Sequence, residues 1–349
     1  MSEIRFSEDF DAHLSIALHR KEYDKYFLLT DNKVYGIYGH LIEGSMKRYN
    51  AKTIVIPEGD ENKNLQTVTK VWQFFVENGA TRHSCLVNFG GGMVTDLGGF
   101  AASTFKRGFD FVNIPTTLLS IIDASVGGKT GINFLDLKNE IGAFSDAACV
   151  IIHKAFIYTL DNEQLLSGYA EMLKHSLIDS EKMWAEIINF DFTRIKTYDF
   201  LVMIKNNVAV KERIVSADPH EGGKRKILNL GHTFGHALET LSHKHNRPIP
   251  HGYAVAYGLV CELYLSCVKL SFPTDKMRQT VKFIRENYGA SDITCKDYDE
   301  LLNLMMHDKK NHDGMINFAL LTDIGCPKLD CHATKDEIFE AFDFLREGF

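Results

Sequence analysis

Short apolar runs alternate with helical patterns through about the first 150 residues. Five runs rich in Val, Ile and Phe, bounded by Gly, Asp or Pro, are typical of buried β-strands; they lie at 26–30, 53–57, 85–89, 109–114 and 149–152. Between the second and third runs, residues 64–79 carry Leu65, Val68, Trp72 and Phe75 at helical spacing, with Gly79 as a stop. Strand–helix alternation predicts an α/β domain with a parallel sheet covered by helices.

The pattern becomes mostly helical from about residue 160 onward. Helices are predicted at 160–178, 198–215, 231–241, 252–270, 275–288, 297–307 and 335–346, and a single strand at 316–321. We therefore expect two domains, residues 1–160 and 161–349, with the second all-α apart from that strand. A cleft between two such domains is a common place for a ligand.

Composition narrows the class of protein. The chain has 45% hydrophobic and 24% charged residues and a net charge of −7, which argues against a nucleic-acid binder because that function needs a basic surface. No apolar run approaches the roughly 18 residues of a membrane span, and the N-terminus lacks a secretory pattern. Seven cysteines with no C-x-x-C pair predict buried thiols in a reducing cytoplasm.

Two glycine-rich segments could bind phosphate. The run from Gly90 to Asp96 (GGGMVTD) follows a strand and opens a helix, where backbone N–H groups favour anions, although a tight strand–helix turn explains it equally well. Residues 125–131 (SVGGKTG) superficially suggest a P-loop, but Asp123 stands where its first glycine would be. Clustering with Lys138-Asn139 nevertheless favours an anion site.

A pair of histidines gives the strongest local metal signal. His232 and His236 stand at i, i+4 and share a helix face, as metal ligands or as a satisfied core pair. His251 offers a further nitrogen, and Glu171, inside an apolar helix near Lys174, is the candidate carboxylate, unless it forms a simple surface Glu–Lys pair. Two charge runs, at 211–225 and 307–311, are explained most simply as solvated surface.

Taken in order, these motifs resemble the sugar phosphate cyclases, and within them the 3-dehydroquinate synthases. The resemblance rests on GGGMVTDLGGFAASTFKRG, IPTTLLSIIDASVGGKTGIN, LKNEIGAF, AEMLKH, EGGKRKILNLGHTFGHALE, HGYAVAYG and DKKN. It covers about residues 24 to 325 and implies an N-terminal NAD-binding α/β domain and an all-α C-terminal domain that binds a divalent metal, zinc or cobalt. It also implies a homodimer in the cytoplasm, acting in the shikimate pathway of aromatic amino acid biosynthesis.

The resemblance assigns roles residue by residue. The implied metal ligands are Glu171, His232 and His251, so His236 becomes an acid–base or substrate group. The implied catalytic residues are Lys129, Lys174, Lys211, Glu221 and His236. The implied substrate-binding residues are Arg107 (reaching the neighbouring subunit), Asp123, Asn139, Arg225, Asn229 and one of Lys309 or Lys310. The implied NAD-binding residues are Asp31, Asp60, Lys63, Gly91, Gly92, Asp96, Thr116, Thr117, Lys138, Phe156 and Thr159.

The implied reaction converts 3-deoxy-D-arabino-heptulosonate 7-phosphate to 3-dehydroquinate and phosphate through transient oxidation by NAD⁺, elimination, re-reduction and aldol closure. A small, doubly anionic substrate fits the Lys and Arg cluster. Alternatives are a cyclase acting on sedoheptulose 7-phosphate or glucose 6-phosphate, a metal-dependent polyol dehydrogenase, and a metal-stabilised binding module. Departures from the family pattern include Asp60, Phe134, Leu137 and Tyr253, which concern loop conformation and substrate choice rather than the reaction class.

Overall fold

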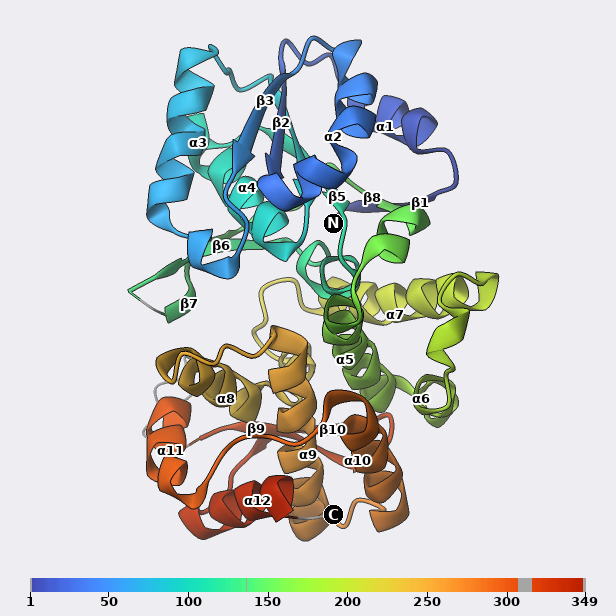
Figure 1. Cartoon of the computed structure of the whole chain (residues 1–349), viewed down its shortest axis with the longest axis vertical. Coiled ribbons are helices and arrows are strands. Elements are labelled where there is room, and N and C mark those ends of the chain that lie inside the picture. Colours follow the sequence, from blue (N-terminus) through green and yellow to red (C-terminus); the bar gives the residue numbers. More distant parts are fainter. Residues whose placement is uncertain (1, 136, 307–315, 348–349) are drawn as a thin grey trace. The chain divides into compact units, whose positions relative to one another are not determined.

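The computed structural model describes residues 2–135, 137–306 and 316–347. The chain divides into two compact units, Met1–Leu160 and Asp161–Phe349. Figure 1 shows that the first is built on a central sheet and the second mainly on helices.

A six-stranded parallel sheet forms the centre of the first unit. Its strands are β1 (Glu3–Ser7), β2 (Tyr26–Asp31), β3 (Lys52–Ile56), β4 (Cys85–Gly90), β5 (Asp110–Pro115) and β8 (Cys149–His153). They lie in the order β1-β8-β5-β4-β2-β3, and every neighbouring pair is parallel. The predicted parallel sheet is confirmed, and the five expected strands lie within one residue of their expected ends. Strand β1 was not predicted, because this short edge strand is only partly buried.

Helices cover the sheet. They are α1 (Phe10–Leu18), α2 (Asn32–Lys47), α3 (Leu65–Glu77) and α4 (Gly92–Thr104). The predicted helix α3 begins after Asn64, whose side chain accepts the Thr67 N–H, and it ends just before Gly79, where φ is +66°. Its buried stripe is Val68, Val71 and Phe75, whereas Leu65 is 40% exposed.

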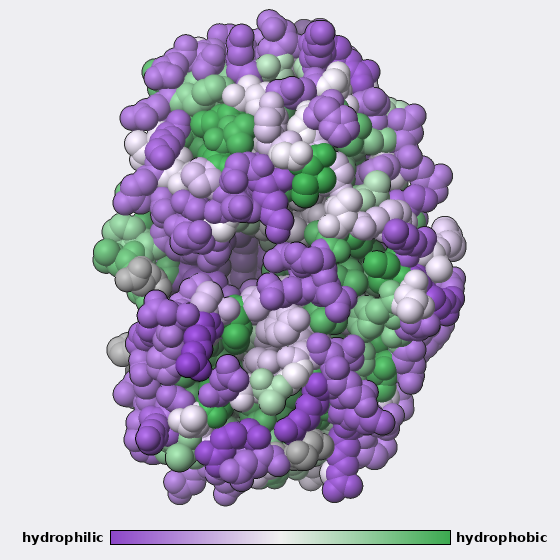
Figure 2. All heavy atoms as spheres, in the orientation of Figure 1, coloured by the Kyte–Doolittle hydropathy of each residue, from purple (hydrophilic) through white to green (hydrophobic). Residues whose placement is uncertain are grey.

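The segment expected to be a phosphate-accessible turn is a β-hairpin. Strands β6 (Lys129–Phe134) and β7 (Leu137–Phe144) pair antiparallel. Gly131 lies opposite Gly142, and a Cβ on Gly142 would stand 2.4 Å from the Thr130 carbonyl oxygen. The strands can pair this closely only with glycine at Gly142. Because glycine has a low β-propensity, the sequence did not indicate a strand here. Several apolar side chains of the hairpin are exposed, and Figure 2 shows the resulting hydrophobic patch.

The second unit is largely helical. Its helices are α5 (Asn162–Asp179), α6 (Glu181–Ile188), α7 (Tyr198–Ala217), α8 (His232–Lys244), α9 (His251–Leu270), α10 (Thr274–Tyr288), α11 (Tyr298–Met306) and α12 (Lys335–Glu347). Helix α9 packs against α5, α8, α10 and α12. By length and composition alone, α9 is long and apolar enough to cross a membrane, although the sequence analysis expected no such segment. Of the most apolar stretch of α9, 67% is buried inside the protein, as in the core helix of a globular protein.

The expectation of an all-α second domain with a single strand is wrong in one respect. Strand β9 (Phe318–Asp323) lies close to the predicted position, but it pairs antiparallel with a second strand, β10 (Cys326–Cys331). The sequence CPKLDC shows no apolar run, because β10 is a mostly exposed strand of a two-stranded ribbon.

Candidate functional site

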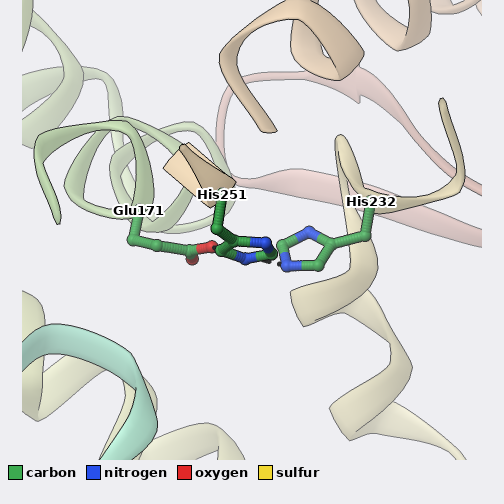
Figure 3. A group of neighbouring side chains, drawn as sticks. All are labelled: Glu171, His232 and His251. Atoms are coloured by element: carbon green, nitrogen blue, oxygen red, sulfur yellow. Dashed lines mark ion pairs between the residues drawn. The ribbon is translucent and has the colours of Figure 1, made fainter. Parts of the chain in front are cut away.

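Three side chains from three helices converge in the second unit (Figure 3). Glu171 lies in the middle of α5, while His232 and His251 are the first residues of α8 and α9. Nε2 of His232 lies 3.4 Å from Oε1 of Glu171, and Nε2 of His251 lies 3.6 Å from the same oxygen. One ligand atom from each residue lies within 4.8 Å of the other two, so the group could hold a metal ion.

The spacing of these atoms fits a divalent metal. Two ligands about 2.1 Å from a tetrahedral ion lie about 3.4 Å apart, close to both measured distances. Glu171 is fully buried; its Oε2 pairs with the Lys174 ammonium, and its Oε1 is left to face the two imidazole nitrogens. A carboxylate and two imidazoles with an open position form a known catalytic zinc donor set. The residues present therefore fit the metal.

The second nitrogen of each imidazole faces an oxygen. His251 Nδ1 lies 3.2 Å from a carboxylate oxygen of Glu239, and His232 Nδ1 lies 3.1 Å from the Leu230 carbonyl oxygen. With Nδ1 as donor in each case, both Nε2 atoms face Glu171, where each would bind a metal in its deprotonated form. Sequence reasoning missed Glu239, although its position seven residues after His232 places it on the same helix face.

Charge differs sharply across this group. Burial acts to raise the pKa of Glu171, but the paired Lys174 ammonium and His232 outweigh it and hold the pKa well below its usual range. Burial, with Lys174, lowers the pKa of His232 to about 3. Burial also acts to lower the pKa of His251, yet the Glu239 and Glu171 carboxylates raise it to about 10. Lys174 is 1% exposed, so its pair with Glu171 is not the surface pair that the sequence allowed.

His236 lies beside the group without joining it. Its ring centroid is 5.3 Å from that of His232 and 6.1 Å from that of His251. The i, i+4 spacing paired His232 with His236 as possible ligands, but the carboxylate-centred group is completed by His251. Because its ring contacts those of His232 and His251, His236 is close enough to exchange a proton with a ligand bound at this group.

A loop after α7 carries further assigned residues. The Asp218 carboxylate accepts backbone N–H groups from Gly222, Gly223 and Arg225 at 2.7–3.0 Å, which folds the loop around it. Arg225 is 2% exposed and donates from its guanidinium to the Pro219 carbonyl oxygen at 2.6 Å. The run at 211–225 is therefore partly buried, not a simple solvated surface.

Other assigned residues of this unit are also placed. Asn229 donates to a carboxylate oxygen of Glu221 at 3.2 Å, which joins two predicted site residues. Lys211, on α7, is 6% exposed. Lys309 and Lys310 lie outside the described residues.

A polar network in the first unit joins several residues that the resemblance assigned to NAD. The buried Lys63 ammonium lies 2.5 Å from Oδ2 of Asp96 and donates to Oδ1 of Asn139 at 2.6 Å. Lys138 lies 3.2 Å from Oδ2 of Asp60, which also accepts from Asn133 at 3.0 Å. Four of these residues were assigned to NAD and Asn139 to substrate; Asn133 was missed, since a strand asparagine carries no motif.

The charges in this network are balanced between two lysines and two aspartates. Burial acts to raise the pKa of Asp60, but the nearby Lys138 and Lys63 charges outweigh it and lower the pKa. Burial raises the pKa of Asp96 despite its pair with Lys63. A bound ligand would compete with existing ion pairs here rather than meet bare cations.

The glycine-rich turn lies where the sequence placed it, between β4 and α4. Gly91 is the N-cap of α4, and a Cβ on Gly91 or Gly92 would stand 3.2 Å from a side-chain atom of Thr117 or Ala124. Thr116, 3% exposed, donates its N–H to the Gly90 carbonyl oxygen at 2.9 Å. The close packing makes this a tight turn, and, as at any helix start, the first N–H groups of α4 have no intrahelical acceptor.

The remaining assigned residues of the first unit are dispersed. Asp31, 7% exposed at the end of β2, caps α2 through the Val34 N–H at 2.8 Å. The Thr159 hydroxyl lies 2.5 Å from that of Tyr38, whose ring contacts the buried Phe156. Lys129 stands at the start of β6, and Arg107 is exposed. Asp123 lies in the π-helical turn Ser120–Ala124, and its charge acts to raise the pKa of Asp96.

Comparison with known proteins agrees with this arrangement. Residues 53–167 match the family model "3-dehydroquinate synthase N-terminal", and residues 168–311 match "3-dehydroquinate synthase C-terminal". A 3-dehydroquinate synthase of Parabacteroides distasonis is 48% identical over 98% of this chain and 97% of its own length. That of Clostridium tetani is 38% identical over 93% of this chain and 86% of its own length.

Solved structures share the fold. A 2-epi-5-epi-valiolone synthase from Streptomyces hygroscopicus subsp. jinggangensis, with NAD⁺ and Zn²⁺ bound, superposes with a TM-score of 0.89 at 23% identity over 99% of this chain and 96% of its own. A 2-deoxy-scyllo-inosose synthase complexed with carbaglucose-6-phosphate, NAD⁺ and Co²⁺ gives 0.84 at 24% identity over 97% and 95%. With two matched family models and relatives of this similarity, the chain belongs to the 3-dehydroquinate synthase family.

Proposed function

We propose that this chain is an NAD-dependent, phosphate-eliminating lyase that converts 3-deoxy-D-arabino-heptulosonate 7-phosphate to 3-dehydroquinate and inorganic phosphate. One observation carries the proposal: Glu171, His232 and His251 bring one possible donor atom each to within 4.8 Å of the others, in a chain 48% identical to a 3-dehydroquinate synthase over nearly its full length.

The chain's own residues prepare a cation site. Glu171, His232 and His251 would hold zinc or cobalt, with Glu239 and the Leu230 carbonyl orienting the imidazoles. In the first unit, Asp60, Lys63, Asp96 and Lys138 would bind NAD⁺ with the glycine-rich turn. When bound, the metal supplies Lewis acidity at a substrate oxygen, and the dinucleotide supplies reversible hydride transfer.

Cationic residues of the second unit suit an anionic substrate. Arg225 carries a planar guanidinium that can bind a carboxylate through two hydrogen bonds, and its loop is fixed by Asp218 before any ligand arrives. Lys211, on α7, adds a nearly buried positive charge. His236 and Glu221 are proposed to move protons, and Lys174 to hold the Glu171 carboxylate in place.

Substrate choice separates this proposal from its alternatives. Cyclases acting on sedoheptulose 7-phosphate or glucose 6-phosphate would not need cations for a carboxylate as well as a phosphate. The fold itself does not discriminate, because an NADH-dependent butanol dehydrogenase from Thermotoga maritima shares it with a TM-score of 0.69 at 14% identity. Such an enzyme would accumulate NADH, whereas a cyclase returns the hydride.

The test measures inorganic phosphate and NADH together. Purified protein with a divalent metal and NAD⁺ far below the substrate concentration should release phosphate from the heptulosonate phosphate over many turnovers, with no lasting rise in NADH absorbance. Phosphate release from sedoheptulose 7-phosphate alone would contradict the substrate assignment. NADH formed in proportion to substrate would contradict the cyclase mechanism.

Three wider assignments belong to the same proposal. The protein would act in the shikimate pathway, in the cytoplasm, as a homodimer. The exposed Arg107, in a left-handed turn with φ of +69°, would extend toward a neighbouring subunit. Sedimentation equilibrium of the wild-type protein checks the dimer, and a monomer at all concentrations would contradict it.

A further inference from the structure

Helices α8 and α9 are joined by two glutamates, one on each helix, and each glutamate contacts the start of the other helix. Each begins with one of the proposed metal ligands, His232 or His251. Glu239 of α8 contacts His251 at the start of α9, and Glu262 of α9 contacts the backbone at the start of α8. The imidazole orientations thus depend on the partner helix as well as on their own.

Glu262 makes two hydrogen bonds around His232. Its Oε2 accepts the Gly231 N–H at 2.6 Å, and its Oε1 accepts the Thr233 N–H at 3.2 Å. These two amides belong to the residues immediately before and after His232. The side chain of Glu262 is fully buried, so both bonds are shielded from water and their directions are fixed by the core.

Close packing of glycines brings Glu262 to this position. A Cβ on Gly258 would stand only 1.9 Å from the Gly231 carbonyl oxygen, and one on Gly235 would stand 3.0 Å from that of Ala254. Gly231 itself has φ of +80°, a left-handed conformation that favours glycine. The two backbones therefore touch where α8 begins, within reach of a carboxylate one helical turn beyond Gly258.

We propose that Glu262 is a positioning residue that fixes the backbone on both sides of His232 and so directs its Nε2 toward Glu171. The inference rests on the metal site proposed above. Glu262 also stabilises the start of α8, because a carboxylate there satisfies free N–H groups and faces the positive end of the helix dipole. The positioning role predicts an effect on metal affinity in protein that remains folded.

Glu262→Gln keeps the size of the side chain but turns one acceptor into a donor facing an N–H group, and Glu262→Ala removes both acceptors. Ser266→Ala is the matched control. Ser266 is equally buried on α9, donates to the Glu262 carbonyl oxygen at 2.6 Å and accepts the Leu321 N–H at 3.1 Å, but contacts no residue of α8 in these bonds.

Each variant is stripped of metal, and its Zn²⁺ dissociation constant is measured by chelator competition, with the visible spectrum of bound Co²⁺ as a second readout. We expect the dissociation constant to rise about 10- to 100-fold in Glu262→Ala, less in Glu262→Gln, with a changed Co²⁺ spectrum. Ser266→Ala should lower the melting temperature but keep wild-type affinity and spectrum. If Glu262→Ala does not fold, Glu262→Gln decides.

Two outcomes would overturn the inference. Wild-type affinity and spectrum in folded Glu262→Gln and Glu262→Ala would reduce Glu262 to a helix cap, while leaving the metal site intact. An equal loss of affinity in Ser266→Ala would attribute the effect to general destabilisation. Failure of the wild-type protein itself to bind Zn²⁺ or Co²⁺ would instead refute the metal site, and with it both proposals.

Discussion

Nδ1 of His251 lies 3.2 Å from Oε2 of Glu239, a carboxylate that is only 2% exposed. This contact determines which imidazole nitrogen is left to face Glu171. A carboxylate behind a metal-binding histidine fixes the ring and increases its basicity. The pair makes Glu239 part of the proposed metal site through His251.

Replacing Glu239 by Ala should weaken Zn²⁺ binding about 10- to 100-fold, because the His251 ring loses its anchor. Calorimetric titration of metal-free protein measures the change. Glu300→Ala is the control, since Glu300 also pairs with α8, through Lys244 at 2.8 Å, but on the exposed surface. Equal affinities in the two variants would contradict the role of Glu239.

Two histidine substitutions should have different effects on the metal. His251→Ala removes one of three donors and should abolish metal retention after purification. His236→Ala should retain metal within about twofold but slow turnover, because its ring contacts the group without completing it. Elemental analysis of both variants, with a phosphate-release assay, provides the measurement. Equal metal loss would show that the ligand assignment is wrong.

Lys63→Met should weaken NAD⁺ binding more than tenfold, because Lys63 bridges Asp96 and Asn139 in the network proposed to bind it. Stability should also fall by about 3 kcal/mol, since the variant leaves a mostly buried carboxylate without its cation. Fluorescence titration and urea unfolding measure the two effects.

Lys21→Met is the matched control for Lys63. Its pair with Asp110 is largely exposed, so the free energy of unfolding should change by less than about 0.5 kcal/mol and NAD⁺ affinity should not change. Wild-type NAD⁺ affinity in Lys63→Met, together with lower stability, would limit Lys63 to a structural role.

Asp218→Asn should change the pH dependence of stability. Hydrogen bonds from the N–H groups of Arg225 and Gly223 hold the pKa of Asp218 below its ordinary value of 3.8. Because the folded-state pKa is lowered, this stabilisation is present above pH 3.8 and is lost as the pH falls through the lowered value. The melting temperature of the variant should therefore lie furthest below that of the wild type near neutral pH, and the gap should narrow under acid.

Calorimetric scans between pH 3 and pH 7 check this dependence. A gap that stays constant over the whole range would show that the charge of Asp218 is not what holds the loop. Turnover of Asp218→Asn near neutral pH provides a second measurement, and we expect a higher KM because Arg225 loses its fixed position.

The residues by themselves predicted much of the first unit. Val, Ile and Phe runs marked five of the six strands of its parallel sheet, because strands buried on both faces are mostly apolar. Periodicity also predicted α3. The apolar face predicted from the spacing included Leu65, but Leu65 is 40% exposed, because burial depends on how α3 packs. Strands β1, β7 and β10 are short or exposed and share their composition with loops, so no local pattern revealed them. Strand β6 was also missed, because its glycine-rich start was interpreted as a turn.

The site divides in a similar way. The types of donor were visible in the sequence: a carboxylate inside an apolar helix, histidines at helix starts and lysines beside glycine-rich turns. Spacing within a helix nevertheless favoured His232 with His236, since i, i+4 geometry is the only proximity that a single helix encodes. The order of the motifs along the chain, taken as a family resemblance, indicated His251 instead of His236 as the metal ligand.

The sequence alone thus determined which chemical groups the chain carries and which helices and strands bear them, because local propensity and hydrophobic period act over a few residues. The tertiary structure decided which groups meet. Glu171, His232 and His251 come from three helices, while Glu239 and Glu262 act across the contact between α8 and α9. Contacts between residues far apart in the chain depend on packing at glycines such as Gly258 and on buried hydrogen bonds, which no local pattern records.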